Sequence, residues 1–107
     1  MLAVDTNVIV RYLTRDDARQ FASASALFAG EDVYVCTTVL LETEWVLRSL
    51  YRYGRPRVIA AFHRAALAAG GKDEGAVGPR GFWPNAYAGY CRDLDGNKLA
   101  AYCTKPE

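Results

Sequence analysis

Two acidic residues in the first half of the chain stand where a short apolar stretch gives way to a helical pattern. Asp5 follows the apolar residues 2–4. Glu42 and Glu44 follow the Val- and Thr-rich residues 33–39, and both are expected in the first turn of the next helix. Open α/β sheets gather the carboxyl ends of their strands at one edge, so we expect Asp5 and Glu42 to face one crevice. A carboxylate pair without cysteine or histidine ligands suits a hard cation such as Mg²⁺ or Mn²⁺.

The same residues also suit a structural role. An acid in the first turn of a helix gains up to about 1 kcal/mol from the helix dipole and from free N–H groups. Thr6 and Asn7 are the predicted N-cap residues of the first helix, and their alternative role is to hold a metal ligand in position by hydrogen bonds. We predict that Glu44 points outward.

Strands and helices alternate around these acids. The predicted elements are a strand at residues 2–4, helices at 7–14 and 18–29, a strand at 32–38 and a helix at 40–51. The last of these helices is expected to place Leu41, Trp45 and Leu50 in or near the core. A strand, two helices and a second strand favour parallel pairing through a right-handed crossover.

Two segments of this region, MLAVDTNVIVRYLTRDD and TTVLLETEWVLRSLYRYG, resemble the start of a PIN-domain ribonuclease of the VapC toxin type. The likeness covers about the first sixty residues. It implies an acidic cluster that binds Mg²⁺ or Mn²⁺ and cuts RNA, with Asp5 and Glu42 as the catalytic, metal-binding members present here. The family's third and fourth acids have no match in this chain. The resemblance also implies an antitoxin partner and a homodimer, for which an open sheet edge gives a physical motive.

Basic and aromatic residues alternate over residues 51–57, where a Gly and a Pro predict a turn between two helices. Four arginines, one of them at the end of the preceding helix, are interleaved with two tyrosines and suit contact with RNA phosphates and bases. These arginines are Arg48, Arg52, Arg55 and Arg57. A solvated helix end, with the arginine stems lying on apolar surface, is the alternative interpretation.

The chain changes character after a Gly-Gly pair at residues 70–71, which ends an alanine-rich helix predicted over residues 58–69. Residues 72–84 are rich in Gly and Pro and predict an exposed loop. Residues 85–92 and 98–103 predict two strands. An Asp-Gly pair lies between them, and this is a strong hairpin signal.

This tail has a resemblance of its own. The segments FHRAALAAGGKDEGAVGP and YAGYCRDLDGNKLAAYC resemble the carboxyl-terminal part of the glyoxalase/bleomycin-resistance (vicinal oxygen chelate) family, over about the last forty-five residues. In that family a Glu shortly after the turn often serves as a metal ligand, and Ala100 holds that place here. The chain therefore looks like a chimera of a PIN-like front half, residues 1–60, and a glyoxalase-like helix, loop and hairpin, residues 61–107.

The hairpin is expected to replace the missing last strands of the nuclease, either by extending the parallel sheet or by packing on an exposed face. Asp93 and Asp95 in its turn would supply missing acids only if the turn reached the crevice. Aspartates at such positions commonly serve the turn itself, which is their alternative role.

The length of 107 residues predicts one domain. A net charge of +1 is too small for the protein as a whole to attract nucleic acid or a membrane surface electrostatically. No apolar run approaches a membrane span and the start has no secretory pattern, so a cytoplasmic location is expected. Cys36, Cys91 and Cys103 lack zinc-site spacing and predict small apolar side chains, with a Cys91 to Cys103 disulfide as the alternative. His63 is predicted to be a packing residue.

These inferences predict a single α/β domain, with a short parallel sheet in a βααβα front, packed helices and a C-terminal β-hairpin. The predicted function is a VapC-like, metal-dependent endoribonuclease with Asp5 and Glu42 as ligands of a weakly held cation. Loss of activity through the missing acids is left open. Two other functions stay open as well: a non-catalytic binding protein with a dimer or antitoxin surface, and a glyoxalase-like binder, against which Ala100 argues.

Overall fold

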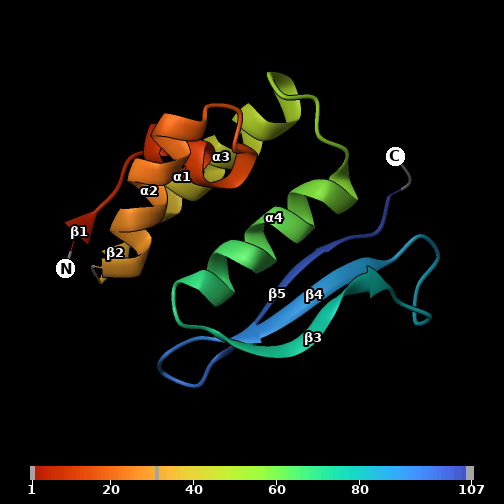
Figure 1. Ribbon diagram of the computed structural model, residues 1–107. Coiled ribbons are helices and arrows are strands. Elements are labelled where there is room, and N and C mark those ends of the chain that lie inside the picture. The colour runs from red at the N-terminus through yellow and green to blue at the C-terminus, as the bar shows by residue number, and fades with distance from the viewer. Residues whose placement is uncertain (1, 31, 106–107) are drawn as a thin grey trace. The chain divides into compact units, whose positions relative to one another are not determined.

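The computed structural model describes residues 2–30 and 32–105, which form an α/β structure with four helices and five strands (Figure 1). The chain divides into two compact units, a front unit, Met1–Arg52, and a tail unit, Tyr53–Glu107. The front unit contains β1 (Leu2–Ala3), α1 (Thr6–Thr14), α2 (Ala18–Gly30), β2 (Val33–Tyr34) and α3 (Thr37–Ser49). The tail unit contains α4 (Arg55–Ala68), β3 (Lys72–Pro79), β4 (Tyr87–Arg92) and β5 (Lys98–Cys103).

The predicted class, with a short parallel sheet and a C-terminal hairpin, is confirmed. The single-domain organisation expected from the length stays a prediction. None of the helices in the described part of the chain combines the length and apolar composition needed to cross a membrane.

A two-stranded parallel sheet anchors the front unit, as the strand, helix, helix and strand order predicts. β1 and β2 pair in the register Leu2 with Val33 and Ala3 with Tyr34. The parallel direction means that the chain leaves both strands at the same edge of the sheet. At that edge β1 leads into α1 and β2 leads into α3.

The second strand is shorter than predicted. It ends at Tyr34, and α3 already begins at Thr37, so residues 37–38 are helical and not extended. The backbone N–H of Leu40 donates to the carbonyl of Cys36 over 3.1 Å, which closes the first helical turn. This hydrogen bonding overrides the preference of the Val- and Thr-rich sequence for a strand.

Aromatic rings join the first two helices. Tyr12 on α1 stacks on Phe21 and Phe28 of α2, with ring centroids 6.0 and 4.4 Å apart. Ile9 of α1 and Ala24 of α2 are buried. The inward-facing stripes of these helices therefore form much of the apolar core of the front unit.

The buried face of α3 differs from the predicted one. Thr43 and Leu47 have no exposed surface, whereas Leu41, Trp45 and Leu50 are 66%, 53% and 68% exposed. The prediction that these last three lie in or near the core is wrong. A buried threonine is tolerated because its hydroxyl donates to the carbonyl four residues earlier over 2.7 Å. The face of α3 that carries Thr43 and Leu47 can therefore pack inward. The face with Leu41 and Trp45 is exposed to solvent.

A hydrogen-bonded network ties the C-terminal end of α1 to the residues just after α3. The Tyr51 hydroxyl and Arg11 Nη1 both donate to Asp16 Oδ2, over 2.7 and 2.8 Å, and the Thr14 hydroxyl donates to Asp16 Oδ1 over 3.0 Å. The bond from Tyr51 is the main cause that lowers the pKa of Asp16, and the bond to Asp16 raises the pKa of Tyr51. Tyr51 and Asp16 lie 35 residues apart, so no local pattern predicts their pairing.

The tail unit is a three-stranded antiparallel sheet with α4 along one face (Figure 1). The predicted hairpin of β4 and β5 is confirmed. The predicted exposed loop at residues 72–84 is wrong over residues 72–79, which form β3 and pair with β4, and right over residues 81–84, which are exposed turn. Two register shifts in β3 show how a glycine-rich segment is accommodated as a bulged strand.

The tail sheet does not include β1 or β2. The expectation that the hairpin extends the parallel sheet is therefore wrong. The hairpin instead gains its third strand from the segment directly before it, because β3 lies close in sequence and its pairing costs little loop-closure entropy.

Two glycines let α4 approach this sheet. A Cβ on Gly89 would lie 2.5 Å from Val77 Cγ1 and 3.1 Å from the ring of His63. A Cβ on Gly71 would lie 2.7 Å from the backbone carbonyl oxygen of Ala66. Side chains at these positions would push the helix and the sheet apart.

The predicted packing role of His63 is confirmed. The ring is buried between α4 and the sheet, where its Nε2 lies 3.0 Å from the carbonyl oxygen of Tyr90 and donates to it. Asp73 Oδ1 lies 3.4 Å from the same nitrogen. The histidine therefore satisfies a backbone acceptor inside the tail unit.

All three cysteines are free. Cys91 is paired with Leu99 and Cys103 with Tyr87, at different ends of the ladder between β4 and β5. Two residues so offset along a hairpin cannot meet the short Cα separation that a disulfide needs. The alternative of a Cys91 to Cys103 bridge is wrong.

Candidate metal centre

Asp5 lies just beyond β1 and is the N-cap of α1. Its backbone is extended, and its Oδ1 accepts a hydrogen bond from the N–H of Val8 over 3.1 Å. The prediction that Thr6 or Asn7 caps this helix is wrong, because both residues lie inside it. No other hydrogen bond engages the Asp5 side chain within residues 2–30 and 32–105, so Oδ2 is available to a ligand.

Glu42 and Glu44 lie on the same helix but differ in what they contact. The first turn of α3 holds no acidic residue, so the predicted first-turn position of both is wrong and the helix dipole does not explain them. Arg48 Nε donates to Glu44 Oε1 over 2.6 Å, and this bond neutralises Glu44. Glu42 is exposed, and it has no ion pair within the part of the chain that the structure describes. Of the two, Glu42 is the carboxylate open to a cation.

The edge where β1 and β2 end carries the N-termini of two helices. Asp5 caps α1 there, and Cys36 is the N-cap residue of α3. The hydroxyl of Thr38, 3.1 Å from the Cys36 thiol, is the main cause of a lowered thiol pKa, and backbone N–H groups of the helix add to it. Hydrogen bonds from the first residues of α3 therefore favour the thiolate form of Cys36. Convergence of Asp5 and Glu42 on one cation stays a prediction.

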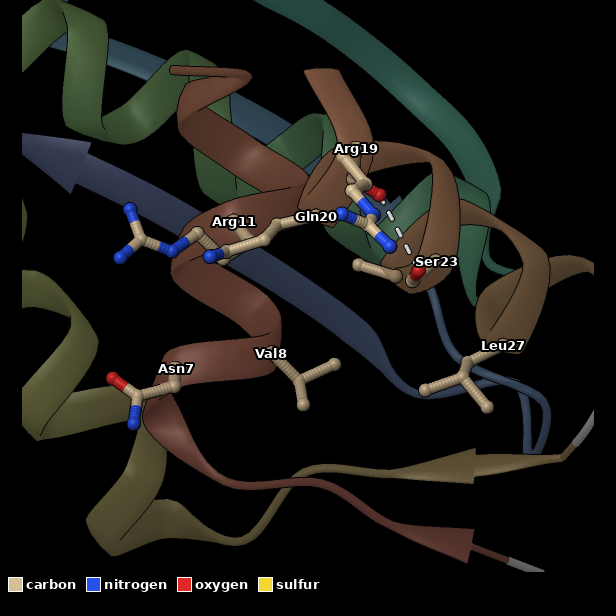
Figure 2. Close-up of a pocket in the computed structure, with 8 residues that line it drawn as sticks. Asn7, Val8, Arg11, Arg19, Gln20, Ser23 and Leu27 are labelled. Carbon is tan, nitrogen blue, oxygen red and sulfur yellow. Dashed lines mark hydrogen bonds between the residues drawn. The ribbon is translucent and has the colours of Figure 1, made fainter. Parts of the chain in front are cut away.

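A groove of about 490 Å³ lies between α1 and α2 (Figure 2). The residues that line it are Asn7, Val8, Arg11, Arg19, Gln20, Ser23, Ala24 and Leu27. Asn7, one of the two predicted supporting residues, is exposed here, whereas Thr6 is buried. Arg19 and Gln20 are not among the predicted site residues, although they are the polar residues directly before Phe21 on α2.

The two candidate ligands, Asp5 and Glu42, offer hard oxygen atoms. Among residues 2–30 and 32–105, no three His, Cys, Asp or Glu side chains come together to hold a metal. Mg²⁺ needs six oxygen ligands and keeps several waters when a protein offers one or two carboxylates. Asp5 and Glu42 therefore fit such a cation in chemistry, and their number predicts weak binding.

The side chain of Asp93 stabilises the hairpin turn. Asp93 Oδ1 accepts from the backbone N–H groups of Asp95 and Asn97 over 3.0 and 2.8 Å, and Oδ2 accepts from the Asn97 amide over 3.0 Å. The bond from the Asn97 side chain is the main cause that lowers the pKa of Asp93. These bonds support the structural alternative for Asp93. Ala100 on β5, which is paired with Tyr90 on β4, brings no carboxylate to the position where the glyoxalase-like pattern has one.

The four arginines proposed to contact RNA are split between the two units. Arg48 pairs with a glutamate one turn earlier, and Arg52 is exposed in a left-handed backbone conformation, φ 55°. In the tail unit Arg55 starts α4, and the guanidinium of Arg57 lies 3.8 Å above the ring of Tyr53. Their common contact with RNA stays a prediction.

Comparison with known families assigns the class of this protein. The family model for the PIN domain matches residues 2–71, which include Asp5, Glu42 and the whole of α4. The match spans more than half of the chain, so the chain belongs to the PIN-domain family, whose fold is nuclease-like. It extends beyond the predicted limit near residue 60, to the start of the tail sheet. Searches of curated proteins and of solved structures found no match.

Proposed function

We propose that this PIN-domain protein is a VapC-like, metal-dependent endoribonuclease, the toxin of a toxin–antitoxin pair, acting on RNA in the cytoplasm. Its acidic site is reduced to Asp5 and Glu42. The observation that carries the proposal is that both carboxylates are exposed and free of ion pairs within the described residues. Glu44, which is paired with Arg48, shows what a neutralised acid on the same helix looks like.

Asp5 and Glu42 would hold one Mg²⁺ or Mn²⁺. A bound divalent cation lowers the pKa of an attacking water and stabilises charge on the scissile phosphate. The residues of this chain would contribute two carboxylates, and Asp5 is placed by its role as the N-cap of α1. Two carboxylates bind Mg²⁺ weakly, so we expect activity that needs a high metal concentration, or none.

The arginines predicted to contact RNA would meet phosphates in this proposal, Arg48 and Arg52 in the front unit and, separately, Arg55 and Arg57 in the tail unit. Asn7, which is exposed two places after Asp5 in the chain, would donate to a phosphate oxygen. Thr6, the residue directly after Asp5, is buried and would help to hold Asp5 in position.

Cleavage of a labelled single-stranded RNA with Mg²⁺ or Mn²⁺ tests the enzyme. Asp5→Asn and Glu42→Gln remove one negative charge each with little change of shape, so each should lower the rate by about a hundredfold or more. Glu44→Gln is the matched control, because it removes the neighbouring acid of the same helix and should leave the rate unchanged.

Metal binding gives a second readout that does not depend on turnover. Mn²⁺ titration followed by electron paramagnetic resonance should show weaker binding in Asp5→Asn and Glu42→Gln but not in Glu44→Gln. Equal cleavage and equal Mn²⁺ affinity in all four proteins would reject the site.

A second candidate function is a non-catalytic binding protein. Leu41 and Trp45, one turn apart on α3, are 66% and 53% exposed, and such an apolar surface favours a protein partner. We propose a homodimer or an antitoxin on this surface. Light scattering of wild-type protein and of the Leu41→Ser, Trp45→Ser double variant tests the dimer, which the double variant should not form.

The chimeric origin of the chain is part of the same proposal. The tail forms its own antiparallel sheet and does not join the parallel strands, which supports an origin separate from the front unit. A glyoxalase-like metal binder gains no support from residue 100, where an alanine stands.

A further inference from the structure

One face of the tail sheet points away from α4. A Cβ on Gly89 would meet the ring of His63 on α4, so the neighbouring residues Ala88 and Tyr90 point to the opposite face, because successive side chains alternate along a strand. On β5 the partners of Ala88 and Tyr90 are Tyr102 and Ala100. We call this surface the tyrosine face, and its long side chains are Lys72, Arg80, Tyr90, Arg92, Lys98 and Tyr102.

The two tyrosines stand among small residues. Tyr90 is paired with Gly75 on one side and Ala100 on the other, and Tyr102 is paired with Ala88. Tyr102 is 69% exposed. Since its cross-strand neighbour carries only a methyl group, the ring is open to a flat ligand. An exposed ring of this kind on a sheet is a stacking platform for a nucleic-acid base.

Two cations lie against the ring of Tyr90. The Arg80 guanidinium carbon and Lys98 Nζ are 5.2 and 5.1 Å from its centroid. Arg80 is fixed in place, because its Nη1 donates to the carbonyls of Gly78 and Pro79 and its Nη2 donates to the carbonyl of Ala76. A guanidinium has five N–H donors, so two remain for another acceptor. Arg80 and Lys98 thus place two positive charges against the half-buried ring of Tyr90.

The charge around this pair is also positive. Lys72 and Lys98 are the cross-strand partners of Arg92 on β3 and β5. Arg92 Nε is bound to Glu74 Oε1 at 3.1 Å, so one acid balances one of the cations. Three cations of the tyrosine face, those at positions 72, 80 and 98, have no ion pair within the described residues. The face therefore complements a polyanion.

We propose that the tyrosine face binds single-stranded RNA, with a base stacked on Tyr102 and a backbone phosphate held by Arg80 and Lys98. Diagonal neighbours on adjacent strands, such as Tyr90 and Tyr102, lie roughly 7–8 Å apart, which is close to the reach of one nucleotide along an extended strand. The inference rests on the proposed function for the identity of the ligand. It adds a holding surface that is separate in sequence from Asp5 and Glu42.

Fluorescence anisotropy of a labelled twelve-nucleotide oligouridine with the full chain tests this proposal. The titration is made in EDTA, so that binding is measured without cleavage. Tyr102→Ala should weaken binding about tenfold by loss of stacking, and Tyr102→Phe should bind as wild type does. Lys98→Ala should lower the slope of log affinity against log salt by about 0.7, as expected for one lost phosphate contact with a single strand.

The controls separate this surface from others. Tyr34→Ala removes a tyrosine that is 51% exposed on the front unit and should not change binding. Arg52→Ala tests the arginines of the turn, and a loss there with no effect of Tyr102→Ala would overturn the proposal. Equal binding of Tyr102→Ala and wild type would do the same, as would equal competition by polyglutamate, which would indicate an acidic protein ligand.

The two proposals can fail separately. Asp5→Asn and Glu42→Gln should bind the oligonucleotide as tightly as wild type while losing cleavage. A chain that binds RNA through Tyr102 and never cuts it would reject the enzyme and keep the tyrosine face. A chain that cuts RNA, with the Tyr102→Phe and Tyr102→Ala variants binding alike, would do the reverse. Circular dichroism of each variant verifies that the tail unit is folded.

Discussion

The front unit and the tail unit differ in charge and in framework. The front unit has five lysines and arginines against seven acids, whereas the tail unit has eight against five. Strands of two residues and three helices build the first, while strands of six and eight residues with one helix build the second. The net charge of +1 for the whole chain does not reveal this uneven distribution of charge between the units. Acids suited to a cation lie in one unit, and cations suited to a polyanion lie in the other.

The difference in framework predicts where single substitutions act most strongly. Leu47 on α3 has no exposed surface and belongs to the helical core of the front unit. Leu47→Ala should lower the free energy of unfolding by about 2–5 kcal/mol, because a buried leucine leaves a cavity. Urea denaturation measures the loss of stability. Hydrogen exchange then shows where it falls, and front-unit amides should lose more protection than tail-unit amides.

Leu41→Ala is the matched control on the same helix. Leu41 is 66% exposed, so its truncation should change the free energy of unfolding by no more than about 0.5 kcal/mol. Equal losses of protection in both units after Leu47→Ala would show that the two units unfold together and that their separation has no thermodynamic meaning.

In the tail unit the most destabilising change we predict is the addition of a methyl group at a glycine. A Cβ at Gly71 would lie 2.7 Å from the Ala66 carbonyl oxygen and 3.1 Å from that of Arg92, and neither backbone atom can move without shifting α4 or β4. Gly71→Ala should cost about 1–3 kcal/mol by overpacking. Gly81→Ala, where a Cβ meets nothing within 4 Å, should be close to neutral in the same denaturation experiment. Equal stability of the two variants would contradict the close approach of α4 to the sheet.

The two units also differ in how far the sequence predicts them. Periodic apolar residues and the order of elements predicted α1, α2 and the parallel pairing, because these depend on local pattern. The Gly- and Pro-rich residues 72–79 indicate a loop when taken alone, and only pairing with β4 makes them a strand. Arg80 was placed in that loop, and for this reason its position over Tyr90 was not predicted.

Within the candidate site, local pattern predicted positions better than boundaries. The apolar residues before Asp5 predicted its place after β1, but its own capping role was assigned to its neighbours. The start of α3 was placed too late, since Val and Thr favour strands and nothing local shows that Cys36 begins a helix. Trp45 was placed in the core because a helix with two apolar faces does not reveal which one has a neighbour.

The smallest predicted effect concerns the network at the end of the front unit and its dependence on pH. The pKa of Asp16 is lowered in the folded chain, mainly by the bond from Tyr51, so this carboxylate stabilises the fold above its unfolded pKa of about 3.9. The contribution is lost as the pH falls through the lowered folded value. Tyr51→Phe should therefore reduce the stability difference between pH 6 and pH 3, with a shift smaller than that of Leu47→Ala because Asp16 is exposed.

Asp16→Asn tests whether the Asp16 carboxylate causes this pH dependence of stability. It should flatten the same acid limb of the stability curve, and combining it with Tyr51→Phe should add little, because both substitutions remove one interaction. Thermal denaturation between pH 3 and pH 6 measures the four proteins. Full additivity of the two changes would show that Tyr51 and Asp16 act separately. Each side chain would then stabilise the junction between α1 and the end of α3 through its other contacts, which for Asp16 are the hydrogen bonds from Arg11 and Thr14.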